Sequence, residues 1–199
     1  MNMNPASGRV LVRKPMLLSV LMFVSASLAV AQCEHTVRMA TYSVCLPRGW
    51  SAEKSKSDDR VYGCNRESTE SCNSKQFRGG LPLPGVVQIV LLPTEKDPYD
   101  RPYRSPEEVV SKELDLNGRR VPVTEIMLDS AQEGDRRCFR ARTVLTDNVW
   151  IEVYGLKINS HLFRASAEYH EEPANIEAYQ AAIVQILSSI SVRTAPGKK

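Results

Sequence analysis

The sequence predicts an α+β domain built around an antiparallel sheet. Four stretches of alternating apolar and polar residues follow residue 120, and the turns between them are too short for the crossover that parallel strands need. A capped helix precedes these strands, and a longer amphipathic helix follows them. Helices that stand apart from a block of strands are typical of the α+β class.

Three further strands are predicted in the first half of the chain. Residues 37–46 alternate as a strand does and end at a Pro-Arg-Gly-Trp turn, where proline and glycine stop it. Residues 51–60 are polar and predict a loop, and residues 61–64 predict a short strand. Residues 86–92 form a continuous apolar run, which is typical of a buried central strand.

The first helix begins at a clear capping signal. Ser105 is the expected N-cap, Pro106 takes the first helical position, and Glu108 completes a capping box. Asn117-Gly118 should end this helix. The four strands that follow are predicted at residues 121–128, 138–145, 149–156 and 162–169.

The closing helix carries the strongest pattern in the chain. It opens at Pro173 and has a broad apolar stripe, which we expect to lie on the core face of the antiparallel strands. The stripe consists of Ile176, Tyr179, Ile183, Ile186, Leu187 and Ile190. Residues 32–192 are therefore predicted to form one domain, and residues 193–199 a short, disordered basic tail.

Residues 1–31 have the pattern of a cleaved signal peptide. Arg9, Arg13 and Lys14 precede an apolar run of about 16 residues that ends in Ala-Val-Ala, a typical cleavage site. The run is shorter than the ~20 residues that a membrane-spanning helix needs, and no later segment is long and apolar enough. Gln32 stands before Cys33 where a lipoprotein signal has a small residue. We therefore expect export to the periplasm or the extracellular space, with no transmembrane segment after cleavage.

Removal of this leader also removes the positive charge of the chain. The leader holds three of the 26 lysine and arginine residues and no acidic residue, so the mature chain has 23 basic and 23 acidic residues. A neutral chain gives no electrostatic argument for binding nucleic acid. The expected partner is a protein of the cell envelope.

All five cysteines lie in the mature chain, where disulfides are expected after export. An odd number leaves at least one thiol free or paired between molecules. Cys64 and Cys72 flank a short polar loop and are the first candidate pair, and Cys33 and Cys45 are the second. Cys138 lies in a predicted strand and is the candidate buried free thiol. The connectivity stays open at this point.

No pattern in the sequence indicates a catalytic, metal or cofactor site. The three histidines lack metal-binding spacing, there is no G-x-S-x-G motif, and the glycine pairs are isolated turn signals. A zinc site at Cys64 and Cys72 is less favoured than a disulfide. We therefore expect a protein that is not an enzyme and holds neither a metal nor a cofactor.

Arginines on the predicted strands are candidates for binding an anionic ligand or an acidic partner. Arg140 and Arg142 share one face of their strand, and Arg164 has the same orientation on another strand. The alternative is an ordinary solvated sheet face, balanced by Glu152 and Glu168.

Two polar connections, residues 64–85 and 96–104, are the predicted recognition surface. The second contains Tyr99, Arg101 and Tyr103, which are residue types enriched at binding hot spots. Long connections in compact domains are frequently functional.

The order of the elements resembles the PsbP-like superfamily, which includes DcrB-type exported bacterial proteins. The resemblance is carried by Leu46-Pro47-Arg48-Gly49-Trp50, by Ser105-Pro106-Glu107-Glu108 and by a closing helix through Ser188-Ser189-Ile190. It implies an α/β/α sandwich around a central antiparallel sheet, and a non-catalytic binding or accessory role. The five cysteines and the extended connection at 64–85 depart from the family pattern, so the resemblance does not name a partner.

The sequence thus favours an exported binding or accessory protein of the bacterial cell envelope. Two alternatives stay open. One is a cysteine-dependent or thiol redox enzyme using Cys138, with His170 as a conceivable partner. The other is a structural protein that is linked into dimers by the odd cysteine.

Overall fold

The computed structural model describes residues 33–55, 58–66, 82, 85–96, 99–115, 121–128, 134–146, 149–170 and 176–193. These residues belong to one compact unit. The predicted signal peptide, most of the 64–85 connection and residues 194–199 lie outside the described residues.

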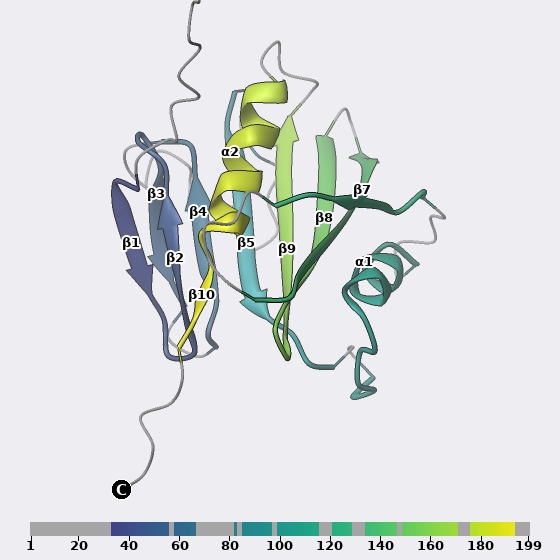
Figure 1. The fold of residues 1–199 in the computed structure, drawn as a ribbon. Helices are drawn as coiled ribbons and strands as arrows, with labels where there is room; N and C mark the ends of the chain where they lie inside the picture. The colour runs from purple at the N-terminus through teal and green to yellow at the C-terminus, as the bar shows by residue number, and fades with distance from the viewer. Residues whose placement is uncertain are drawn as a thin grey trace, which may run out of the picture. The chain divides into compact units, whose positions relative to one another are not determined.

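Within the described ranges the chain forms a seven-stranded and a three-stranded sheet, both antiparallel between neighbours (Figure 1). The large sheet has the order β3-β4-β5-β9-β8-β7-β6. Its strands are β3 (Ser51–Lys54), β4 (Val61–Cys64), β5 (Val87–Pro93), β6 (Thr124–Ile126), β7 (Arg136–Thr146), β8 (Val149–Ile158) and β9 (His161–His170). The small sheet has the order β1-β2-β10, with β1 (His35–Arg38), β2 (Tyr42–Leu46) and β10 (Ser191–Val192).

The prediction of a single strand over residues 37–46 is wrong, because the chain reverses there into the β1-β2 hairpin. The carboxylate of Asp59 accepts hydrogen bonds from the backbone N–H groups of Ala40 and Thr41, each at 2.8 Å. An acidic side chain from a distant segment therefore stabilises the turn, so the alternation of apolar and polar residues within 37–46 does not predict it.

Two other segments also differ from the sequence prediction. Residues 51–54 were expected in a loop, but they form β3, which pairs with β4 from Ser51↔Cys64 to Lys54↔Val61. The sequence predicts that Arg193 belongs to the tail, yet its backbone N–H donates to the Thr41 carbonyl at 2.8 Å and its guanidinium to the Met39 carbonyl at 2.8 Å. Strand pairing decides both positions, and polar residues are compatible with an edge strand.

Helix α1 (Pro106–Asp115) begins as the capping signal predicts. Ser105 Oγ accepts the Glu108 N–H at 3.1 Å, and Glu108 Oε2 accepts the Arg104 N–H at 2.7 Å. The helix packs directly on Gly155 of β8, where a Cβ would lie 1.9 Å from the Pro106 carbonyl oxygen. Glycine is required here because the two backbones touch.

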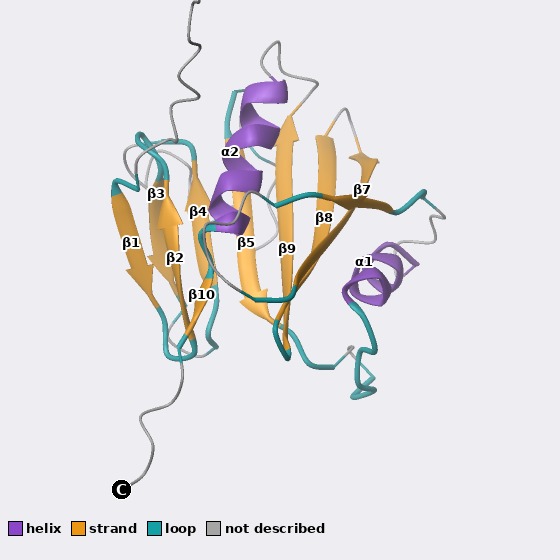
Figure 2. Ribbon diagram, viewed as in Figure 1, coloured by secondary structure: helices purple, strands orange, loops and turns teal. Residues whose placement is uncertain are grey.

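Helix α2 (Ile176–Ser188), drawn in purple in front of β9 in Figure 2, packs on the face of the large sheet opposite α1. Gln180 of α2 contacts Glu152, whereas α1 contacts Gly155, and residues an odd number apart on a strand point to opposite faces. Ile183 and Leu187 are completely buried in the main core, which α2 shares with both sheets. The predicted α+β class, with helices on both sides of an antiparallel sheet, is confirmed.

Candidate functional site: a groove between two strand edges

Strands β1 and β3 end their respective sheets. Among the described residues β1 pairs with β2 alone and β3 with β4 alone. Each strand therefore has one side that no other described strand pairs with, where its backbone N–H and C=O groups can accept another extended chain. The β2-to-β3 connection, residues 47–50, joins the two sheets next to these edges.

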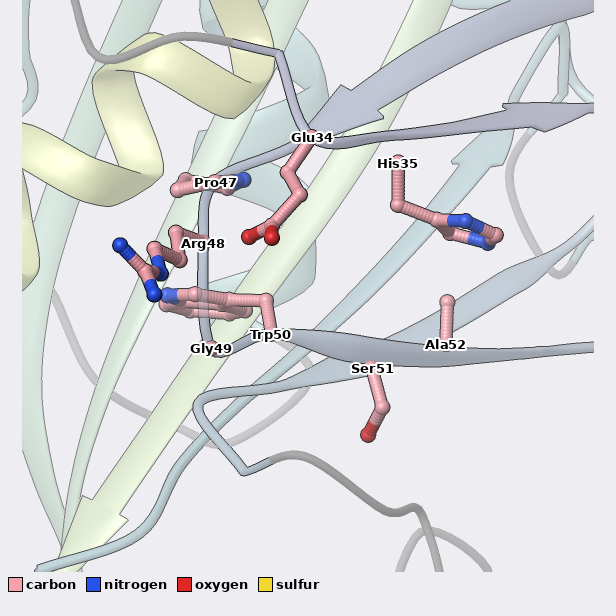
Figure 3. A pocket seen from close by; sticks show the side chains of 8 residues that line it. All are labelled: Glu34, His35, Pro47, Arg48, Gly49, Trp50, Ser51 and Ala52. Atoms are coloured by element: carbon pink, nitrogen blue, oxygen red, sulfur yellow. The ribbon is translucent and has the colours of Figure 1, made fainter.

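A cavity of about 550 Å³ lies where the two edges begin (Figure 3). Its walls come from the segment entering β1 and from the start of β3, and its base is the 47–50 turn. We call this cavity the edge groove. It is lined by Glu34, His35, Pro47, Arg48, Gly49, Trp50, Ser51 and Ala52.

The turn at the base of the edge groove is fixed by its sequence. Trp50 N–H donates to the Pro47 carbonyl at 3.2 Å, which closes the turn. Gly49 has a φ of 77°, a conformation that costs a non-glycine residue energy, and a Cβ at this position would meet no atom within 4 Å. Glycine is therefore needed for its backbone conformation rather than for space. Trp50 remains half-buried, with part of its ring packed against the core.

A disulfide holds the wall of the edge groove that is formed by the segment entering β1. Cys33 is bonded to Cys45 of β2, with their Cα atoms 5.5 Å apart, and it immediately precedes the groove residues Glu34 and His35. Of the four residues of β1, only Val37 is buried. The short strand β1 thus depends on its pairing with β2 and on this disulfide.

A second cavity, of about 390 Å³, lies where the same two strands end. It includes Arg38 from β1 and Lys54 from β3, together with Asp58 and Asp59. Strands β1 and β3 therefore run in the same direction, from the edge groove to this second cavity.

The structure does not bring the three predicted arginines together. Arg164 of β9 is opposite Gly155 of β8, which is itself opposite Phe139 of β7, so Arg164 lies on the α1 face. There it pairs with Glu113 of α1. Arg140 and Arg142 lie on the α2 face, so the expected common orientation is wrong. The sequence fixes alternation within each strand, but the register between strands decides which faces coincide.

Arg142 belongs to a buried network rather than to a solvated face. Its guanidinium lies 4.0 Å from the centre of the Trp150 ring, and its Nε is 3.6 Å from Glu152 Oε1. Glu152 is fully buried, whereas the sequence suggested a solvated counter-charge. Its carboxylate also accepts hydrogen bonds from Tyr169 at 2.8 Å, from Gln180 at 2.6 Å and from Tyr154. This network ties α2 to the sheet, because Gln180 belongs to α2.

The tyrosines of the 96–104 connection have different environments. Tyr99 is 68% exposed, and the Arg101 guanidinium lies 5.2 Å from the centre of its ring. Tyr103 is buried, and its N–H donates to the Glu95 carbonyl at 3.0 Å. Tyr103 is therefore part of the support of this connection, and only Tyr99 and Arg101 present themselves at the surface.

One of the two expected cysteine pairs is complete among the described residues. Cys33 and Cys45 form a disulfide, Cys64 is also disulfide-bonded, and Cys72 lies outside the described residues. Cys138 is a free, completely buried thiol, and burial raises its pKa to about 12. A thiol in this environment stays protonated and has little nucleophilic character.

The sequence does not predict the edge groove, although the Leu46–Trp50 motif that contains its turn is visible in it. The groove depends on residues 51–54 forming an edge strand, and their polar composition predicts a loop. Within the described ranges no cluster of three His, Cys, Asp or Glu side chains is arranged to hold a metal, and no helix combines the length and apolar character for crossing a membrane.

Comparisons with known proteins yield structural similarity only. No family model matches the chain, and no curated protein matches it in sequence. Among solved structures the chain is similar to a protein from Bacteroides thetaiotaomicron VPI-5482, with a TM-score of 0.45 and 10% identity over 79% of this chain. The match covers 47% of that protein, so this chain spans about half its length. The chain is also similar to the cyanobacterial PsbP (CyanoP) of Synechocystis sp. PCC 6803, with a TM-score of 0.42 and 12% identity over 80% of this chain and 92% of that one. A PsbP protein is thus among the structures that are similar to this chain.

Proposed function

We propose that this chain is an exported, non-catalytic binding protein of the bacterial cell envelope that takes a protein partner at the edge groove. One observation carries the proposal: two strand edges border a single cavity whose base holds a half-buried tryptophan. Tryptophan combines a large apolar surface with a hydrogen-bond donor and is enriched at binding hot spots. The signal-peptide pattern and the Cys33–Cys45 disulfide support export.

The two alternatives from the sequence find less support. Both need an accessible thiol, whereas Cys138 is 0% exposed and its pKa is raised to about 12. A catalytic thiol needs the opposite shift, and an intermolecular disulfide needs a sulfur atom at the surface.

Site-specific photocrosslinking in cells tests the proposal. A photoreactive amino acid replaces the exposed His35 in the edge groove, Tyr99 in the sequence-predicted recognition loop, or Ser160 in the distant β8-β9 turn as a control. We expect one dominant protein adduct from position 35 and none from position 160. The same variant with Trp50→Ala should lose the adduct, and Trp50→Phe should retain part of it. Equal labelling at all positions, or an adduct from position 99 alone, would refute the assignment to the edge groove.

A further inference from the structure

The second cavity, at the far end of β1 and β3, has acidic and basic side chains that differ in their partners. It contains two acidic and two basic side chains, but the acidic ones are already engaged. Asp59 accepts three hydrogen bonds, from the N–H groups of Ala40 and Thr41 and from the Thr41 hydroxyl. Asp58 forms an ion pair with Arg60 at 2.7 Å.

Unlike these carboxylates, the two cations of this cavity lack partners among the described residues. The side chains of Arg38 and Lys54 make no hydrogen bond or ion pair within the described part of the chain, and both residues are exposed. One comes from the last residue of β1 and the other from the last residue of β3. The cavity therefore offers two positive charges without an ion-pair partner among the described residues, one on each strand edge, beside one carboxylate in an ion pair with Arg60 and another held by hydrogen bonds.

The common direction of β1 and β3 restricts how an added strand can lie. Both strands run from the edge groove to the Arg38 and Lys54 cavity. A single extended segment running the opposite way is antiparallel to both, and antiparallel pairs are the commoner type. With about 3.3 Å per residue, the four residues of β1 correspond to roughly four residues of the added segment.

We propose that the partner segment is an extended peptide that adds antiparallel to these edges and places an acidic side chain between Arg38 and Lys54. Four residues further along, on the same face of that segment, an apolar side chain enters the edge groove against Trp50. The segment thus has an acidic residue and an apolar residue at positions i and i+4. This inference rests on the proposed function and specifies which sequences the edge groove accepts.

A display library of random octapeptides, selected on the immobilised mature protein, tests this specificity. We expect enriched sequences to carry Asp or Glu four positions before an apolar residue. Replacing that acid by Asn or Gln in a selected, fluorescently labelled peptide should weaken binding about three- to tenfold at low salt, as expected for two exposed ion pairs. The double variant Arg38→Gln/Lys54→Gln should bind both peptides equally, at the level of the neutral peptide.

Control variants separate the inference from the proposed function. Lys157→Gln removes a partly exposed cation near the distant β8-β9 turn and should leave the preference for the acid unchanged. Selected peptides without the acidic position, a preference that survives Arg38→Gln/Lys54→Gln, or no enrichment at all would overturn the inference. Loss of crosslinking at His35 on Trp50→Ala would still uphold the edge groove itself, so the two failures are distinguishable.

Discussion

The Cys33–Cys45 disulfide allows the wall of the edge groove to be removed selectively. The bond closes a loop of 12 residues of sequence separation, and the chain-entropy relation for a loop of this size gives about 3 kcal/mol at 25 °C. We expect Cys33→Ser/Cys45→Ser to lower the free energy of unfolding by about this amount. With a urea dependence of ~2 kcal/mol per molar, the midpoint should fall by about 1.5 M.

Local protection distinguishes loss of the wall from general destabilisation. Hydrogen exchange should show β1 amides losing protection under native conditions while the amides of β9, at the centre of the large sheet, keep theirs. Peptide binding at the edge groove should weaken in parallel. The pair Cys33→Ala/Cys45→Ala is the matched control for the added hydroxyl groups. A midpoint unchanged within about 0.2 M, or β1 protection equal to that of the parent, would refute this account of the wall.

Four other predictions concern the core and its titratable groups. Ile183→Asp places a charge at a completely buried position of α2 and should abolish secretion of folded protein, whereas Ala181→Asp on the exposed side of the helix should not. Normal yield and cooperative melting of Ile183→Asp would contradict the packing of α2 on the sheet. Gly155→Ala should cost about 2–3 kcal/mol in urea unfolding, because its Cβ meets the Pro106 backbone, and Gly63→Ala, which meets the Ile89 side chain at 3.0 Å, should cost less. Cys138 should resist a thiol reagent at pH 8 until the protein is unfolded, while an added Ser160→Cys thiol reacts at once; fast native labelling of Cys138 would show that it is accessible. Burial raises the pKa of Glu168 above 4.5, so the folded state binds this proton more tightly than the unfolded state does. The free energy of unfolding should therefore fall as the pH rises from the unfolded pKa through the folded pKa, and Glu168→Gln should remove that decline. Equal urea midpoints of variant and parent at both pH 4 and pH 7 would contradict this account.

Local signals in the sequence were sufficient for the helices and the central strands. The Ser105 cap forms as expected, and the apolar stripe of α2 is buried at Ile183, Ile186 and Leu187. These features depend on residues within a few positions of one another, where capping and periodicity operate.

Features that depend on distant pairing could not be predicted in the same way. The β1-β2 turn is held by Asp59, and Arg164 lies on the α1 face because of the register of β9 against β8. The polar segment 51–54 becomes a strand because β4 supplies its hydrogen-bond partners. The edge groove arises from this last pairing, so its cavity could not be predicted even though the Trp50 turn was visible in the sequence.

The exposed strand edges explain why charge should govern specificity here. The unpaired backbone groups of an uncovered edge can pair with any extended chain, and charged side chains along an edge commonly reduce such nonspecific pairing. Exposed charges lie at Glu34, just before β1, at Arg38 in β1, and at Glu53 and Lys54 in β3. Such charges disfavour an apolar or similarly charged segment but leave the backbone groups available. A segment with an acid at the Arg38 and Lys54 end meets two cations there, which makes the same residues both the protection of the edge and the basis of its selectivity.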